Sequence, residues 1–169
     1  MNGEEDKAYF LERFSGLLHI RAEDAEFEPA YKSYFRAAHV TPRIDRVVTA
    51  LELFRAALES ENVTSHFILL TLVADRLFSP GLRSKVLVRG LREKMSRLLA
   101  EQVPEWVTSD YRNRNKMLYG SVRTVRLDEK ELRQEICPRW RNLLRSLLRH
   151  ILVKDKVRLF ANTERLKRI

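Results

Sequence analysis

Apolar residues recur at helical spacing through most of the chain and predict a protein built from helices. Within residues 5–19, one face carries Phe10, Phe14, Leu17 and Leu18. A second run follows the acidic connector 23–28, and its stripe is aromatic: Phe27, Tyr31, Tyr34 and Phe35. Because the neighbourhood of this stripe is acidic, we expect it to pack in the core rather than to stack on bases.

Three further helices are separated by capping and breaking residues. The pattern predicts helices over 41–60, 64–78 and 82–102. The helix over 64–78 is apolar nearly all round, so we expect it to be central, with Leu72 buried. The residues that start and stop these helices are Thr41-Pro42, Asn62 or Thr64, Ser79-Pro80-Gly81 and Pro104.

Residues 104–127 show no helical period in their apolar positions. Tyr119-Gly120-Ser121-Val122 places a Gly-Ser pair between short alternating runs, which is typical of a two-residue hairpin turn. The stretch therefore predicts one short β-hairpin near 115–126, with an irregular loop or a short helix as the alternatives.

The C-terminal part returns to helical spacing. A helix is predicted over 129–136 behind Asp128, and Pro138 marks a kink or a restart. From residue 138 to residue 153 one broad face is apolar: Trp140, Leu143, Leu144, Leu147, Leu148, Ile151 and Leu152. Together these runs predict an all-α fold, a single domain over residues 1–169 arranged as an antiparallel bundle or stack of about six to seven helices.

Composition supports this fold and removes several classes of function. The chain has 169 residues but only 5 Gly and 5 Pro, which favours long helices over a glycine-rich nucleotide fold. The one cysteine, Cys137, excludes an internal disulfide and a cysteine-based zinc site. No metal-ligand spacing occurs among the four histidines, so we expect no metal and no cofactor.

The N-terminus and the apolar runs indicate an intracellular protein, cytoplasmic or nuclear. The first ten residues are acidic and fit neither a secretory signal nor a transit peptide. The longest apolar stretch, 67–74, is too short to span a bilayer, so we expect no membrane contact.

Charge is divided unevenly along the chain. The whole protein carries a formal net charge of +9, of which residues 1–80 contribute −4 and residues 81–169 contribute +13. Most basic residues of the second half are arginines, whose planar five-donor fork suits phosphate and carboxylate alike. Two groups are the candidate nucleic-acid-binding residues: Arg112, Arg114, Lys116, Arg123 and Arg126 in the first, and Arg141, Arg145 and Arg149 along one helix edge in the second.

Two hypotheses follow from this asymmetry. The first is a non-enzymatic protein that binds nucleic acid, RNA more than one DNA sequence, by phosphate contacts from the basic half. The second is an interaction or structural subunit whose basic half docks on an acidic partner protein, with a homo-oligomer as one such assembly. Arginines around one groove would favour the first hypothesis, and arginines around an exposed apolar patch would favour the second.

One short pattern keeps an enzymatic function open. Arg145 and His150 stand in the R-x4-H form, which resembles the motif of all-α HEPN-type ribonucleases. The resemblance implies that Arg145 and His150 would act on a scissile phosphate. No other catalytic arrangement of residues occurs, and we expect the paired carboxylates at helix starts to complement helix dipoles instead.

Overall fold

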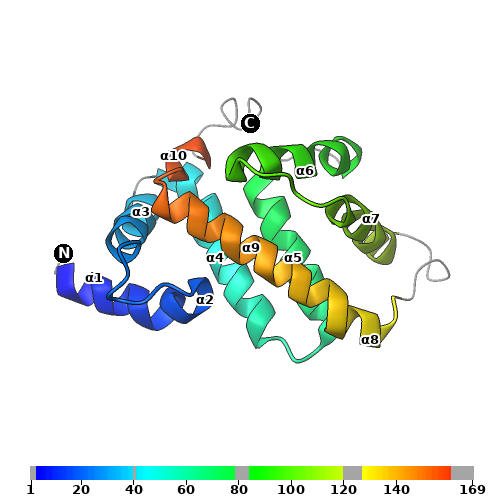
Figure 1. The fold of residues 1–169 in the computed structure, drawn as a ribbon, viewed down its shortest axis with the longest axis horizontal. Coiled ribbons are helices and arrows are strands. Elements are labelled where there is room, and N and C mark those ends of the chain that lie inside the picture. Colours follow the sequence, from blue (N-terminus) through cyan, green and yellow to red (C-terminus); the bar gives the residue numbers. More distant parts are fainter. Residues whose placement is uncertain (1–2, 40, 79–83, 120–126, 161–169) are drawn as a thin grey trace.

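The computed structural model describes residues 3–39, 41–78, 84–119 and 127–160, and the side chains within these ranges except those of 39, 41–45, 84–89 and 119. These ranges form eight continuous helices and no strand, and seven of the helices have seven residues or more (Figure 1). The predicted all-α fold of about six to seven helices is confirmed for the part of the chain that the structure describes.

The N-terminal helix consists of α1 (Gly3–Phe10), a π-helical stretch (Leu11–Ser15) and α2 (Gly16–Leu18). It ends at His19, whose φ of 53° is left-handed. Its apolar face packs on α3 (Phe27–His39), and the rings of Phe14 and Tyr34 lie 4.8 Å apart. The aromatic stripe of α3 therefore belongs to the core, as predicted.

Helices α4 (Thr41–Glu59) and α5 (Val63–Phe78) form an antiparallel hairpin behind α9 in Figure 1. Asn62 caps α5, since its Oδ1 accepts the Ser65 N–H at 2.9 Å, which was one of the two predicted starts. One expectation was wrong: Leu72 is only partly buried, whereas Leu70 is fully buried. Leu72 thus lies on a side of α5 that its neighbours do not cover completely, although the helix is apolar nearly all round.

Helices α6 (Ser84–Leu99) and α7 (Trp106–Tyr119) pack on each other. The apolar positions lose their helical period after residue 104, yet residues 106–119 are helical, so the described part of 104–127 fits the alternative of a helix and not the hairpin. Residues 115–119 of the predicted hairpin thus belong to α7, and residues 120–126 lie outside the described part of the chain. The inward face of α7 explains the error: it alternates apolar and charged side chains, namely Val107, Asp110, Tyr111 and Arg114.

The last long helix consists of α8 (Glu129–Glu131), a π-helical stretch (Leu132–Ile136) and α9 (Cys137–Val153), and α10 (Val157–Phe160) follows. Asp128 caps it by accepting the Lys130 N–H. Pro138 neither ends nor restarts the helix. Proline has no N–H and its ring conflicts with the carbonyl four residues earlier. The wider turn before it, with the Cys137 N–H on the Leu132 carbonyl, relieves that conflict.

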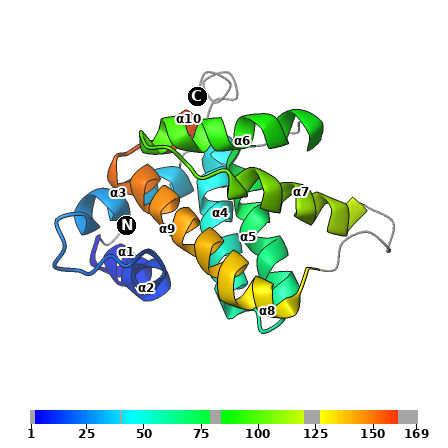
Figure 2. The same cartoon turned by 45° about the vertical axis from the view of Figure 1, so that its right-hand side comes forward.

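Helix α9 is the central element of the fold. It crosses the front of α4 and α5, with the N-terminal helix and α3 on one side and α6 and α7 on the other (Figures 1 and 2). Trp140 and Leu147 are fully buried on it, as expected. Because α9 carries part of the basic half into contact with helices of the acidic half, the two charge halves of the sequence are interleaved in space.

Candidate phosphate-binding surface on helix α9

The structure separates the predicted site residues into two surfaces. Arg139 of α9 pairs with Asp110 of α7, so α7 covers one side of α9. Arg145 and Arg149 bind backbone carbonyls at the end of the N-terminal helix, on another side. The predicted residues of α7 and those of α9 therefore do not form one site. Arg123 and Arg126 lie outside the described residues.

Arg112 and Lys116 are exposed on α7, as a surface contact requires. Arg112 borders an open cavity of about 490 Å³. The charge there is mixed, because the cavity is also lined by Glu93 and by Glu105, which pairs with Arg92 at 3.1 Å. This surface therefore combines both signs of charge.

Arg114 requires a correction, because the structure places it inside the protein. The side chain is 4 % exposed, and its Nη2 lies 2.7 Å from Asp75 of α5. The Tyr111 hydroxyl donates to the other oxygen of Asp75, and Arg114 also donates to Asn115. Arg114 thus neutralises a carboxylate between α5 and α7, and it is not available to a phosphate in this fold.

The arginines of α9 occupy three different environments along one edge. Arg145 Nε donates to the Leu17 carbonyl at 2.9 Å, and Arg149 Nη1 donates to the His19 carbonyl at 3.4 Å. Both arginines therefore satisfy carbonyls at the C-terminus of the N-terminal helix, where positive charge complements the helix dipole. Arg149 also pairs with Glu26 at 2.5 Å. Arg141, among the described residues, has neither a carboxylate partner nor a hydrogen bond.

His19 joins these arginines from the N-terminal helix. Arg145, burial, Arg149 and Arg141, in that order of size, hold the pKa of His19 below its usual value. A left-handed residue at the helix end brings this imidazole beside α9, a placement that apolar periodicity could not reveal. We call Arg141, Arg145, Arg149 and His19 the α9 edge. Of the described carboxylates, only Glu26 pairs with it.

A small polar cavity of about 180 Å³ lies at the Arg141 end of the α9 edge. It is formed where the turn before α5 meets the start of α9. Its lining residues are Ser60, Glu61, Val63, His66, Arg133, Cys137, Pro138 and Arg141. Burial and, secondarily, Arg141 lower the pKa of His66. Burial raises the pKa of Cys137 to about 11, so the thiol stays protonated and is no nucleophile at neutral pH.

The structure directs Arg145 and His150 of the R-x4-H pattern to different neighbours. Arg145 binds the Leu17 carbonyl, whereas burial, Lys156 and Lys154 lower the pKa of His150, which lies near the end of α6. Residues five apart on a helix lie about 140° apart around its axis. The structure therefore does not bring the two side chains to one phosphate-sized site.

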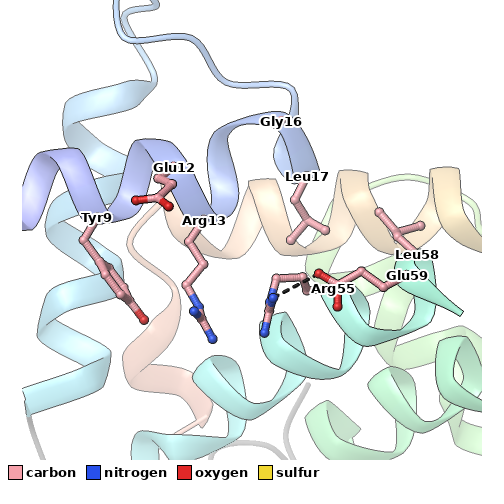
Figure 3. A pocket seen from close by; sticks show the side chains of 8 residues that line it. All are labelled: Tyr9, Glu12, Arg13, Gly16, Leu17, Arg55, Leu58 and Glu59. Carbon is pink, nitrogen blue, oxygen red and sulfur yellow. Dashed lines mark hydrogen bonds and ion pairs between the residues drawn. The ribbon is translucent and has the colours of Figure 1, made fainter.

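A third cavity, of about 510 Å³, separates the N-terminal helix from the end of α4 and was not foreseen from the sequence (Figure 3). Tyr9 and Arg13 reach into it from one side, and Arg55 and Glu59 from the other. Glu52 links the two sides, because it accepts two bonds from Arg13 at 2.9 Å and one from Arg55. Its arginines are thus already bound to carboxylates.

Within the described residues no group of three or more His, Cys, Asp or Glu side chains could hold a metal ion. No described helix is long and apolar enough to cross a membrane. No family model, curated protein or solved structure matches the chain.

Proposed function

We propose that the protein binds the phosphate backbone of nucleic acid, RNA more than one DNA sequence, through the α9 edge and without catalysing a reaction. The observation that carries the proposal is the convergence of three arginines and His19 from two helices with one carboxylate partner among the described residues. The positive charge comes from the three guanidinium groups, since the lowered pKa of His19 favours its neutral form. Such an excess of positive charge attracts polyanions, and arginine binds phosphate oxygens through two parallel N–H donors.

The buried aromatic residues define the mode of binding. Trp140 and Tyr111, which could stack on bases if exposed, are 0 % and 2 % exposed. Contacts along the α9 edge would therefore go to phosphate and sugar, which position a strand but read no sequence. We expect similar affinities for unrelated sequences of equal length.

The alternative partner, an acidic protein, has less support. Stable protein interfaces have a core that is depleted of charge and enriched in large apolar side chains. Of the described large hydrophobic residues only Tyr9 and Leu118 are exposed, at 42 % and 39 %, and they lie on α1 and α7. No apolar patch accompanies the α9 edge among these residues, which favours a phosphate backbone as partner.

The test is a titration of the purified protein with unrelated RNA and DNA oligonucleotides at two salt concentrations, read by fluorescence anisotropy. Arg141→Gln is the informative variant, because Arg145 and Arg149 also hold the N-terminal helix. Loss of one phosphate contact should weaken binding to all sequences about equally and reduce the slope of log K against log salt by about 0.7–0.9. Arg158→Gln, an exposed arginine of α10, is the matched control and should bind like the wild type.

Three results would overturn the proposal. Binding that is unchanged by Arg141→Gln but weakened by Arg112→Gln would assign the site to α7. If Arg158→Gln weakens binding as much as Arg141→Gln does, the effect reflects the net charge of the protein and not a site on the α9 edge. Absence of RNA and DNA binding, with an Arg141-dependent capture of an acidic protein, would establish the alternative.

A further inference from the structure

The small cavity beside Arg141 is smaller than the two other cavities described above, and its lining is mainly polar. At about 180 Å³ it is smaller than the roughly 300 Å³ at which pockets for drug-sized ligands begin. It has no room for a nucleoside but fits a single small polar group. It lies between two helices that are distant in sequence, so its shape depends on the complete fold.

Two arginines of the α8–α9 helix line the cavity. Arg141 has no described carboxylate partner, and Arg133 pairs only with Glu129, at 3.0 Å, in a pair whose side chains are 60 % and 72 % exposed. Exposed pairs of this kind are weak, so Arg133 can exchange Glu129 for another anion at little cost. Two guanidinium groups at one small cavity are suited to an oxyanion.

His66 provides a third donor from α5. The His66 side chain lines the cavity, and its Nε2 makes no hydrogen bond within the described residues. Neighbouring atoms cover Nε2 from solvent in this conformation, so the imidazole has to turn slightly before an oxyanion can reach it. Buried polar atoms in proteins are nearly always bonded, so an unpartnered one calls for an explanation. A protonated imidazole donates from Nε2, and a bound oxyanion would both accept that bond and favour the protonated form.

We propose that this cavity binds a phosphate monoester, with Arg141, Arg133 and His66 as its ligands. The inference rests on the proposed function and deepens it, because a nucleic-acid strand whose backbone follows the α9 edge would place its terminal phosphate here. A monoester carries more charge than an internal diester and exposes three oxygens to these donors. The α9 edge would hold the strand, and the cavity would recognise its phosphorylated end.

Glu61 gives the cavity a residue whose removal should have the opposite effect. It lines the cavity from the turn before α5 and is exposed there. Its carboxylate repels a phosphate, so Glu61→Gln should tighten binding of a phosphorylated strand while Arg141→Gln weakens it. A general change in stability or in folding would not move the two variants in opposite directions.

The experiment compares one RNA sequence with a 5′-phosphate, a 3′-phosphate or hydroxyl groups at both ends. We expect one phosphorylated end to raise the affinity roughly tenfold or more, the range for hydrogen bonds to a charged group. Arg141→Gln and His66→Ala should remove that preference, and Arg158→Gln should retain it. A second reading uses inorganic phosphate and the imidazole signals in NMR spectra, in which we expect phosphate to raise the pKa of His66 and to leave that of His150 unchanged.

The outcomes separate this inference from the proposed function. Strands that bind with Arg141 dependence but show no preference for a phosphorylated end, without any response of His66 to phosphate, would overturn the cavity proposal and leave the α9 edge in place. A response of His66 to inorganic phosphate without any binding of strands would support the cavity, assign it to a small phosphate compound, and overturn the proposed function.

Discussion

Arginine side chains of this protein differ in function according to the carboxylates and carbonyls around them. Arg114 is buried against Asp75, Arg145 binds the end of a helix, and Arg141 has no described partner. These differences arise from tertiary contacts between residues as far apart as 130 positions in sequence. Sequence spacing placed Arg141, Arg145 and Arg149 on one helix edge correctly, but it could not reveal which of them was already occupied.

Among single residues, we expect removal of the Asp110 carboxylate to lower the free energy of unfolding most. Its carboxylate is buried and accepts bonds from Arg139 at 3.0 and 2.5 Å and from Trp140 Nε1 at 3.0 Å. Desolvation raises the pKa of Asp110, and these bonds oppose the shift. Asp110→Ala would leave the buried indole N–H and Arg139 without an acceptor. We expect it to lower the free energy of unfolding by roughly 2–5 kcal/mol in urea denaturation.

Glu105→Gln is the control for this prediction. It removes a carboxylate from an ion pair near the start of α7, but one in which the glutamate side chain is 90 % exposed. Its cost should stay below about 1 kcal/mol. Equal costs for the two variants would show that the Asp110 network adds nothing to an ordinary surface pair.

Glu52 should make the contact between the N-terminal helix and α4 sensitive to acid. Its bond from Arg13 holds the pKa of Glu52 below the usual value. A lowered pKa in the folded state stabilises the protein above the unfolded pKa of about 4.5, and this stabilisation is lost as the pH falls through the folded pKa. The stability difference between the wild type and Glu52→Gln should therefore be largest near pH 7 and shrink below pH ~4.5.

Urea denaturation at pH 7 and at pH ~3 measures this difference. Glu12→Gln, an exposed glutamate of the same cavity, should differ from the wild type by a similar small amount at both pH values. A Glu52→Gln difference that persists unchanged in acid would contradict the assigned role.

At the scale of elements, apolar periodicity was a reliable guide where cores are apolar. It located the N-terminal helix, α3, α4, α5 and α9, because one face of each buries mainly aliphatic and aromatic side chains. It failed for α7, where Asp110 and Arg114 take two buried positions and conceal the period. A buried charged residue depends on its partner on another helix, and that partner is not visible in the local sequence.

The same comparison predicts unequal costs for truncating two leucines. Leu147 of α9 is fully buried, whereas Leu72 of α5 is only partly buried. Leu147→Ala should lower the free energy of unfolding by roughly 2–5 kcal/mol, from lost burial and the cavity left behind. Leu72→Ala should cost less than half as much. Thermal or urea unfolding of both variants tests the placement of these helices, and a larger cost at Leu72 would contradict it.

At the scale of the whole molecule, the charge asymmetry of the sequence is real but does not divide the fold. Helix α9 comes from the basic half and packs on α2, α3 and α5 of the acidic half. Glu26 and Glu52 of the acidic half form ion pairs with arginines. Among the described residues, positive charge that these pairs leave uncompensated lies on the α9 edge, where several helices meet. A sum of charges along the chain could not locate that edge.

Uncompensated charge on the α9 edge should also be visible in thermal stability. Burial and, secondarily, Arg141 lower the pKa of Arg145 and of His66, and Arg141 adds to the larger effects of Arg145, burial and Arg149 that lower the pKa of His19. Adding salt should therefore raise the melting temperature of the wild type more than that of Arg141→Gln, because the variant has less repulsion to screen.

A ligand that neutralises the α9 edge should likewise raise the melting temperature. RNA at about 100 times its Kd should stabilise the fold by about 2.7 kcal/mol, which corresponds to a shift of roughly 5–10 °C for a chain of this size. The Arg158→Gln control should reproduce both shifts of the wild type. A wild type whose melting temperature responds to neither salt nor RNA would mean that this charge is balanced within the folded protein, and the α9 edge would then have no electrostatic reason to bind a polyanion.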